Sequence, residues 1–421
     1  MRLHKRTVAT QTGSIPIILF GAFDRHNFGD LLFPHIFTAL LGRQKLMYAG
    51  LMERDMRAYG GHKVFSLSQI IKGAKQEPVC IVHVGGELLT CSAWEAAVML
   101  LSGSEADEMI AGCGDDTEAQ LHWARTFLGI TDLAPYVAAR TSMMQAVAYN
   151  AVGGTDLSLQ NPALRNEVFH KLAQADHIGV RDMHTLAALR AAGVQAQLVP
   201  DSAVMVAQLF AETIDRHARQ GEAAQACNAY SQGYIALQFS ADFGRADILE
   251  RLCAQLKRFA VANSYGIVLF RAGAAPWHDN LEHYEQLAAR LSKVPVRIFH
   301  SLNVWDICAL IARSRAYCGS SLHGRIVALA FGRPRLTLRH PDQPRSLPTK
   351  HEAFVQTWED RTLPGVLDIE ELERGLCAAL HGDLNRLQNQ ATDLAALYRQ
   401  GFSGMGRCLE KLDEIDRPTR N

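Results

Sequence analysis

The sequence predicts an α/β protein with two Rossmann-like, doubly wound parallel sheets. Three observations predict this class: short apolar runs recur along the chain, each ends at glycine or a polar turn, and a stretch with helical spacing follows most of them. The alternation pauses once, at residues 212–228, where the sequence is polar, rich in alanine and without a strand pattern. Two units that face each other across a cleft are therefore expected.

The first unit begins with a continuously apolar run at residues 15–20, which ends at Gly21, and helical spacing follows over about 31–41. Further strands are expected at 79–84 and 146–152, each closed by two glycines. Two more short strands are expected at 177–180 and 196–199. The helix between them is expected to run to about residue 192.

The second unit repeats the pattern after the pause. Its expected strands are at 234–239, 267–270, 296–299, 315–318 and 335–338. Its expected helices are at 246–261, 280–291, 305–311 and 322–331. Leucine and alanine spacing predicts a helical tail from residue 368 to beyond 399.

These patterns divide the chain into four parts. We expect an N-terminal domain over residues 1–212, a linker over 213–230, a C-terminal domain over 231–365 and a helical tail over 366–421. The N-terminal domain contains a partly helical, glycine-containing insertion at about 102–135. Ligands of open α/β sheets bind at the carboxyl ends of the strands, so the site is expected there.

The charge balance narrows the class of ligand. Lysine and arginine together number 43, as do aspartate and glutamate, so the net charge is zero. Such a chain has no overall field to hold nucleic acid, and none is expected as a partner. Any anion must be bound by a few cations and backbone N–H groups gathered in one place.

The compartment is expected to be the cytoplasm. The nine cysteines are scattered, mostly in apolar runs, and are typical of reduced core residues. The first 14 residues lack the apolar stretch of a signal peptide, and no run is long enough to span a membrane. No cluster of cysteine and histidine has the spacing of metal ligands, so no metal is expected.

The sharpest candidate site lies between the strand expected at 315–318 and the following helix. Ser320 or Ser321 is placed to cap this helix, whose first N–H groups then form an anion site. His323 would face a bound anion as a proton donor, and Arg325 would add a permanent charge. The alternative is an ordinary turn with capping serines and a packed histidine, which spacing alone favours.

The segment from Ala312 to Pro334 around this turn resembles the C-terminal signature of the polysaccharide pyruvyl transferase family. Four further segments resemble family motifs in the same order, over about residues 15–360. They are the turns at Gly21–Asp30, Gly85–Leu89, Gly179–Asp182 and Val199–Ala203.

The resemblance implies a transferase of exopolysaccharide or cell-surface glycan synthesis. Family members transfer the enolpyruvyl unit of phosphoenolpyruvate to a sugar, usually as a cyclic ketal, in a fold similar to that of two-domain glycosyltransferases of the GT-B type. The expected partners are phosphoenolpyruvate and a sugar or lipid-linked oligosaccharide acceptor. No cofactor is expected.

The resemblance also implies roles for particular residues. The family's general acid falls on His323, and its donor-binding arginine falls on Arg181. The other expected donor-binding residues are Ser320, Ser321, Leu322, Gly324, Arg325 and Lys350. Many members carry arginine where this chain has Ser321, which leaves one donor cation unassigned between Arg325 and Lys350.

The acceptor side is expected in the N-terminal domain. Asn27, Gly29 and Gly86 are expected to bind the acceptor, with Asp30 and Glu87 as catalytic carboxylates. Asp30 can instead cap the helix expected from residue 31, and Glu87 can instead be an ion-paired residue at the edge of the site. Structural roles are expected for two further groups. Asp201 is expected to fix a loop. The five tryptophans are core residues or sugar-stacking surfaces, and the core is favoured.

Two other functions stay open at this point. One is a nucleotide-sugar glycosyltransferase of the same architecture, and the other is a sugar- or anion-binding relative without catalysis. An oxidoreductase is disfavoured because the glycines after the first strand do not form a dinucleotide-binding turn. The sequence leaves open the acceptor sugar, the oligomeric state and peripheral contact with a membrane.

Overall fold

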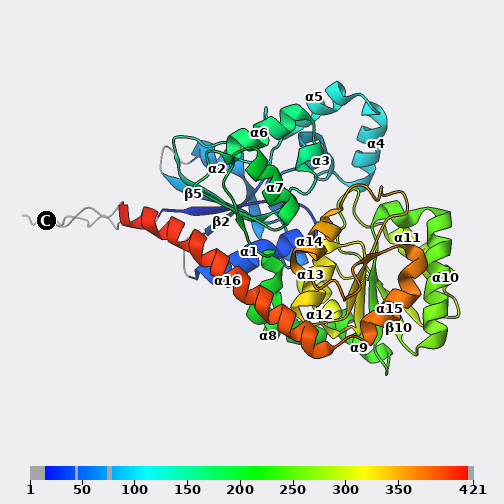
Figure 1. The fold of residues 1–421 in the computed structure, drawn as a ribbon. Coiled ribbons are helices and arrows are strands. Elements are labelled where there is room, and N and C mark those ends of the chain that lie inside the picture. Colours follow the sequence, from blue (N-terminus) through cyan, green and yellow to red (C-terminus); the bar gives the residue numbers. More distant parts are fainter. Residues whose placement is uncertain (1–14, 43–45, 74–77, 416–421) are drawn as a thin grey trace, which may run out of the picture.

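The computed structural model describes residues 15–42, 46–73 and 78–415, which form two parallel sheets with helices on their faces (Figure 1). The first sheet has the strand order β3-β4-β2-β1-β5-β6-β7-β8, and the second has the order β11-β10-β9-β12-β13-β14. All neighbouring strands pair in parallel except β3 and β4. Both sheets are wound in two directions from a central strand, as predicted.

The first sheet and its helices occupy the first half of the chain. Its strands are β1 (Ile17–Phe20), β2 (Leu46–Gly50), β3 (Arg54–Asp55), β4 (Lys63–Ser66), β5 (Val79–Val84), β6 (Met144–Val152), β7 (His177–Val180) and β8 (Gln197–Leu198). Its helices are α1 (Phe28–Leu41), α2 (Leu67–Gly73), α3 (Ala93–Val98), α4 (Gly103–Cys113), α5 (Thr117–Leu128), α6 (Pro162–Leu172) and α7 (Met183–Ala191). Short 3₁₀ helices are η1 (Arg57–Tyr59), η2 (Leu157–Leu159) and η3 (Ser202–Met205).

The second sheet follows after two helices, α8 (Val206–Ala218) and α9 (Gly221–Ala229), which cover the stretch expected as a linker. Its strands are β9 (Tyr234–Gln238), β10 (Gly266–Phe270), β11 (Val296–Phe299), β12 (Ala316–Gly319), β13 (Arg335–Leu338) and β14 (Val366–Leu367). Its helices are α10 (Ala246–Ala262), α11 (Leu281–Arg290), α12 (Val304–Arg313), α13 (Leu322–Ala330), α14 (Lys350–Trp358) and α15 (Leu372–Leu380), with 3₁₀ turns η4 (Ala241–Gly244) and η5 (Ile369–Glu371). The exact domain limits stay a prediction.

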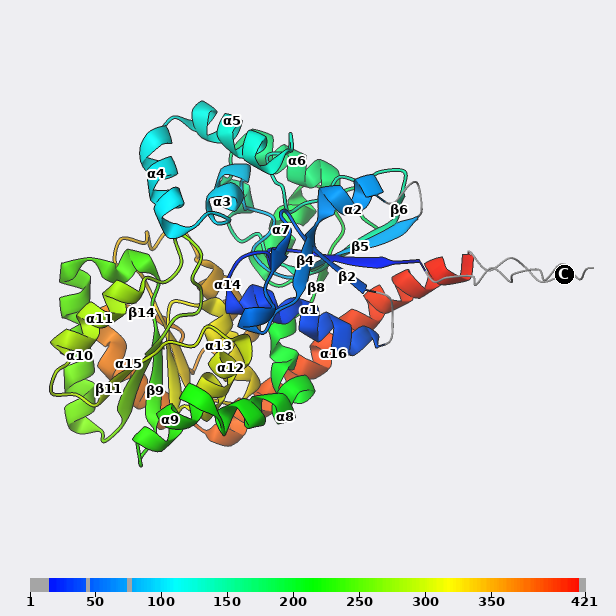
Figure 2. The ribbon, with the colours of Figure 1, turned by 180° about the vertical axis from the view of Figure 1, so that it is seen from behind.

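The C-terminal segment is not a separate tail. β14 completes the second sheet, and α15 packs against α10 and β13. The long helix α16 (Leu384–Ile415) then runs back across both halves and packs on α13, η3 and β6 (Figures 1 and 2). Sequence spacing predicted the helices but not this return, because spacing shows an apolar face and not the surface that covers it.

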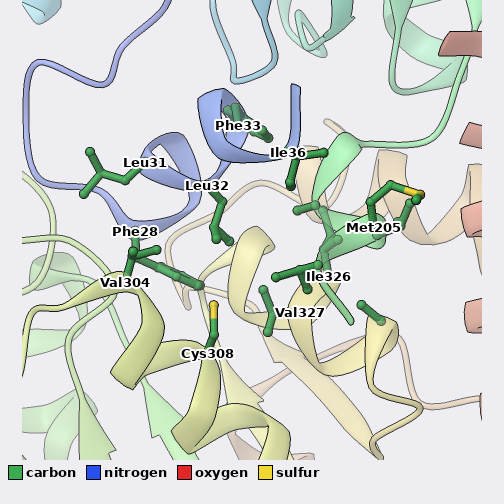
Figure 3. Packing of buried hydrophobic residues seen from close by; sticks show 14 of the residues in the cluster. Phe28, Leu31, Leu32, Phe33, Ile36, Met205, Val304, Cys308, Ile326 and Val327 are labelled. Atoms are coloured by element: carbon green, nitrogen blue, oxygen red, sulfur yellow. The ribbon is translucent and has the colours of Figure 1, made fainter. Parts of the chain in front are cut away.

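A single apolar cluster joins the two halves of the molecule. Figure 3 shows Phe28 and Leu32 of α1 pointing toward Val304 and Cys308 of α12 and Ile326 of α13. All five side chains are fully buried. The amino ends of α1 and α13 are therefore held against each other by close packing.

No helix within the described ranges combines the length and the apolar character that crossing a membrane requires.

Replacing Tyr398 on α16 by phenylalanine is expected to destabilise the fold. The Asn150 side chain of β6 donates a 2.8 Å hydrogen bond to the buried Tyr398 hydroxyl. Without that oxygen a buried amide N–H loses its partner, so the free energy of unfolding should fall by about 1–3 kcal/mol. Urea unfolding measures this loss. Tyr265→Phe is the control, because the Tyr265 hydroxyl has no hydrogen-bond partner among the described residues, and equal loss in both variants would contradict the assignment.

Candidate active site

The predicted site residues come together where strands of both sheets end. Glu87 follows β5, Arg181 follows β7, and His323 lies in the first turn of α13, directly after β12. The loop after β1 leads into α1 and reaches the same place, because Gly29 contacts the His323 ring. This placement agrees with the rule for open parallel sheets that guided the sequence analysis.

The turn before His323 is fixed by three hydrogen bonds. Ser321 is the N-cap of α13, and its side chain accepts a 3.2 Å hydrogen bond from the Gly324 N–H. The Tyr317 hydroxyl accepts from the Ser321 N–H at 3.1 Å and donates to the Ser321 carbonyl at 2.9 Å. Gly324 has no room for a β-carbon because the Tyr317 ring lies against it. Of the two possible caps, Ser321 is therefore the one used.

Ser320 and Leu322 have supporting positions beside this cap. The Ser320 hydroxyl accepts a 2.9 Å hydrogen bond from the Ser240 N–H, which ties the ends of β9 and β12 together. Leu322 is buried in the apolar cluster that joins the two halves. Both residues hold the turn in place.

His323 is 8% exposed and is covered by helix α1. The Phe33 ring meets it edge-on, with ring centroids 5.1 Å apart. A β-carbon at Gly29 would collide with the His323 ring, and Nδ1 is the atom it would meet first. Gly29 therefore makes room for the histidine, a role different from the close approach to a ligand that the sequence suggested.

Asp201 lies behind the histidine. Its Oδ2 is 3.7 Å from His323 Nε2, which is ion-pair distance but longer than a hydrogen bond. Nε2 is buried and has no hydrogen-bond partner among the described residues. Burial alone would raise the pKa of Asp201, but His323 and Arg181 beside it lower the pKa to about 2. Asp201 is therefore an anion facing the histidine, and more than the loop-fixing residue expected.

Arg181 connects this aspartate to Glu87. Its Nη1 donates to Asp201 Oδ2 at 2.9 Å, and its Nη2 donates to Glu87 Oε2 at 2.5 Å. Glu87 also accepts a 2.8 Å hydrogen bond from the Thr155 N–H through its other oxygen. The four side chains of Glu87, Arg181, Asp201 and His323 thus form one continuous row of contacts at ion-pair distance that crosses between the two sheets.

Arg325 does not fit the donor-binding position expected from the sequence. It is fully buried, and its Nε and Nη2 donate to the Glu359 carboxylate at 2.7 and 2.9 Å. Its remaining N–H groups donate to the carbonyls of Pro364 and Gly365 at 3.0 and 3.1 Å and to the Thr337 hydroxyl at 3.4 Å. Arg325 therefore holds the second domain together, and it presents no free N–H to a ligand.

Lys350 occupies the first position of α14 and is exposed. It makes no hydrogen bond or ion pair with any residue of the described ranges. Its charge affects residues of both halves. Burial and Glu87 raise the pKa of Asp156, and Lys350 opposes this rise. Burial and the charge of Lys350 lower the pKa of His351, the next residue of α14, well below its usual range. Of the two cations left open, Lys350 is the one that is free.

The loop after β1 decides between the two interpretations of Asp30. Asn27, and not Asp30, caps α1, because its side chain accepts a 3.0 Å hydrogen bond from the Gly29 N–H. Asp30 is buried in the first turn, where it lies 3.9 Å from Arg25. Gly86, with φ at 88°, lies beside it, since a β-carbon there would be 3.4 Å from Asp30 Oδ1. The capping alternative for Asp30 is wrong.

Within the described ranges, no group of three or more histidine, cysteine, aspartate or glutamate side chains is placed to hold a metal ion.

Replacing Glu359 by glutamine is expected to cost about 3–5 kcal/mol of unfolding free energy at pH 7, because it leaves two buried arginines without their counter-charge. Arg325 and Arg335 both donate to this carboxylate. Burial alone would raise the pKa of Glu359, but the two arginines lower it from 4.5 to about 2. The stabilisation is therefore present above pH 4.5 and disappears as the pH falls through about 2.

The measurement is urea unfolding of both proteins between pH 3 and pH 7, with Glu285→Gln on the exposed face of α11 as the control. The difference between the wild type and Glu359→Gln should narrow toward pH 3. Equal stability of the two Glu→Gln variants at pH 7 would contradict a structural role for the Arg325 pair.

Comparison with solved structures identifies the fold. UDP-N-acetylglucosamine 2-epimerase from Rickettsia bellii is similar over 97% of this chain and 99% of its own, with 10% identity and a TM-score of 0.55. A putative UDP-N-acetylglucosamine 2-epimerase from Listeria monocytogenes is similar over 97% of this chain and 100% of its own, with 12% identity and a TM-score of 0.51. At these identities the likeness shows the fold alone, and it confirms the GT-B-like arrangement of two parallel α/β units.

Comparison of the sequence gives the family. No curated protein matches the sequence. The profile of the family described as polysaccharide pyruvyl transferase matches residues 59–342, which is more than half of the chain and includes Glu87, Arg181, Asp201 and His323. This confirms the resemblance drawn from the motifs: the chain belongs to the polysaccharide pyruvyl transferase family, and it is a transferase.

Proposed function

We propose that this protein transfers the pyruvyl group of phosphoenolpyruvate to a sugar of a polysaccharide or lipid-linked oligosaccharide, forming a ketal and releasing phosphate. The observation that carries the proposal is the setting of His323. Its Nε2 lies 3.7 Å from the Asp201 carboxylate, while Nδ1 lies over Gly29. Asp201 is thus placed to stabilise a protonated imidazole at His323, and histidine is the usual side chain for proton exchange near neutral pH.

His323 acts in this proposal as the general acid. It gives a proton to the methylene carbon of phosphoenolpyruvate, and the positive charge that develops at the neighbouring carbon is attacked by a sugar hydroxyl. Phosphate then leaves, and a second hydroxyl of the same sugar closes the cyclic ketal. A positioned acid accelerates such a step by about 10²- to 10⁴-fold. Asp201 supports it by stabilising the protonated imidazole and fixing the ring.

The donor carries a carboxylate and a phosphate, and this site offers two cations to bind them. Arg181 lies in the same row as His323 but is already bonded to Glu87 and Asp201. Lys350 is unpaired and supplies the charge that many family members place at the position of Ser321. The free N–H groups at the start of α13 add a third favourable interaction.

Glu87 and Asp30 are the two carboxylates proposed to receive protons from the acceptor hydroxyls. When a donor anion pairs with Arg181, Glu87 Oε2 is released from its 2.5 Å hydrogen bond and becomes available as a base. Asp30 of α1 lies beside Gly86, and Gly86 is the residue before Glu87. The acceptor thus meets the donor from the side of the first sheet, with Asn27 and Gly86 at its edge.

Replacing His323 by alanine is expected to abolish pyruvyl transfer and to leave the Kd of phosphoenolpyruvate within about tenfold, because the acid acts in the transition state. Transfer is measured as phosphate released and as pyruvate found in the product with a panel of sugar and lipid-linked acceptors. Donor binding is measured separately by calorimetry.

His170→Ala is the matched control, since His170 is exposed near the end of α6. Loss of donor binding together with transfer would make His323 a binding residue. If the wild-type protein incorporates no pyruvate into any acceptor and phosphoenolpyruvate does not raise its melting temperature, the proposed function is wrong.

Replacing Lys350 by glutamine is expected to weaken donor binding and to leave the fold intact. The lost contact joins a permanent charge to an anion, so the Kd of phosphoenolpyruvate should rise by about 10- to 100-fold. Because Lys350 has no partner among the described residues, the melting temperature should stay unchanged. Lys257→Gln on the exposed face of α10 is the control for loss of one positive charge. Equal Kd values for the two variants would exclude Lys350 from the donor site.

A further inference from the structure

The loop that follows β10, residues 271–280, carries an exposed tryptophan next to the site. Trp277 is 47% exposed, whereas the other four tryptophans are partly buried. They are Trp94, Trp123, Trp305 and Trp358. Trp277 is therefore the one tryptophan whose environment does not fit the core position expected for all five.

The backbone of Trp277 is strained. Its φ is +63°, a left-handed conformation that favours glycine and is rare for a bulky residue. Ala151 is the only other non-glycine residue with positive φ in the described part of the chain. Such strain persists where the surrounding structure enforces it and where the exposed side chain has a use.

Hydrogen bonds on both sides of Trp277 enforce its conformation. Before it, the Ala275 N–H donates to the His26 carbonyl at 3.3 Å, which ties the loop to the first domain. After it, the His278 N–H donates to the Ala275 carbonyl at 3.1 Å, and the His278 carbonyl accepts from the Ala241 N–H at 2.7 Å. The backbone on both sides of Trp277 is thus fixed by hydrogen bonds that do not involve the indole.

A further hydrogen bond of this loop places it beside the candidate active site. The Asn27 side chain bonds the His278 ring at 3.1 Å, and Asn27 caps α1, whose Gly29 contacts His323. Burial, together with the charges of Arg25 and Lys350, lowers the pKa of His278 to about 4, so both cations lie near this ring. The preceding residue, Trp277, is therefore on a loop at the rim of the site, and its side chain is exposed.

We propose that the indole of Trp277 is the platform on which the acceptor sugar stacks. This inference rests on the proposed function and names the part of the site that orients the acceptor. The ligand is a pyranose ring that presents an uninterrupted C–H face, because such a face packs on a flat aromatic surface while the hydroxyls on the ring edge stay free to react. The loop keeps its strained conformation so that this surface points at the sugar.

The test compares Trp277→Gly, Trp277→Phe and the wild type. Glycine relieves the positive φ, so Trp277→Gly should raise the melting temperature, while the acceptor KM rises at least tenfold and the Kd of phosphoenolpyruvate stays the same. Phenylalanine keeps an aromatic surface, so Trp277→Phe should recover most of the acceptor affinity. A purely structural tryptophan would give a lower melting temperature in the glycine variant and no selective change in the acceptor KM, and that result would overturn the proposal.

A second measurement does not depend on turnover. Methyl glycosides of the common hexoses and N-acetylhexosamines are titrated while tryptophan emission is recorded. A blue shift is expected in the wild type and in the control Trp123→Phe on α5, and it should be absent in Trp277→Phe. If the wild type transfers no pyruvate but shows this shift, the proposed function fails and the sugar platform stands. If no glycoside shifts the emission, the platform is wrong whether or not transfer occurs.

Discussion

The packing of α1 against α12 and α13 is the contact on which the rest of the site depends. Phe28 and Leu32 are fully buried against side chains of the second domain, and close-packed interfaces of this kind do not deform continuously. Because Gly29 and Phe33 lie on the same helix, the packing also fixes their distance from His323. The position of the proposed acid is therefore set by the apolar core and needs no ligand to form.

Ion pairs link the buried charges of the site. Arg181 pairs with both Glu87 and Asp201, and Asp201 also lies at ion-pair distance from His323, which is how buried charges are accommodated. In the proposed mechanism, a donor anion takes the place of Glu87 beside Arg181, and Lys350 adds a second positive charge. Binding of the donor and freeing of a base would then be one exchange of partners.

The sequence predicted most strands of both sheets from short apolar stretches that end at a glycine or a polar turn. The limits of β5, β7, β11 and β13 agree with the structure residue by residue, although β11 is an edge strand and only partly buried. β4 was missed because its residues alternate between exposed and buried near the edge of the sheet, and four residues are too few for such alternation to stand out.

The candidate site was predicted less completely, because side-chain direction and distant pairing are not local properties. Asp201 and His323 are far apart in the sequence, so nothing near either residue shows that they meet. The position of Arg325 did have a local signal. Residues two apart on a helix point to different faces, so His323 and Arg325 were not both able to face one ligand. The small residues before His323, Gly319 to Ser321, fitted either a helix cap or an anion site, and the structure shows that Ser321 is the cap.

Ser321 also gives a physical reason for the proposal that the donor cation of this chain is Lys350. At this position a serine satisfies the Gly324 N–H, a capping interaction whose loss costs about 0.5–2 kcal/mol of stability. An arginine there would give up the cap and bring a planar, bidentate charge to the donor, whereas Lys350 brings a mobile point charge from α14. The proposed site therefore combines a fixed turn under His323, where the proton would move, with a flexible lysine, which would only neutralise charge on the donor.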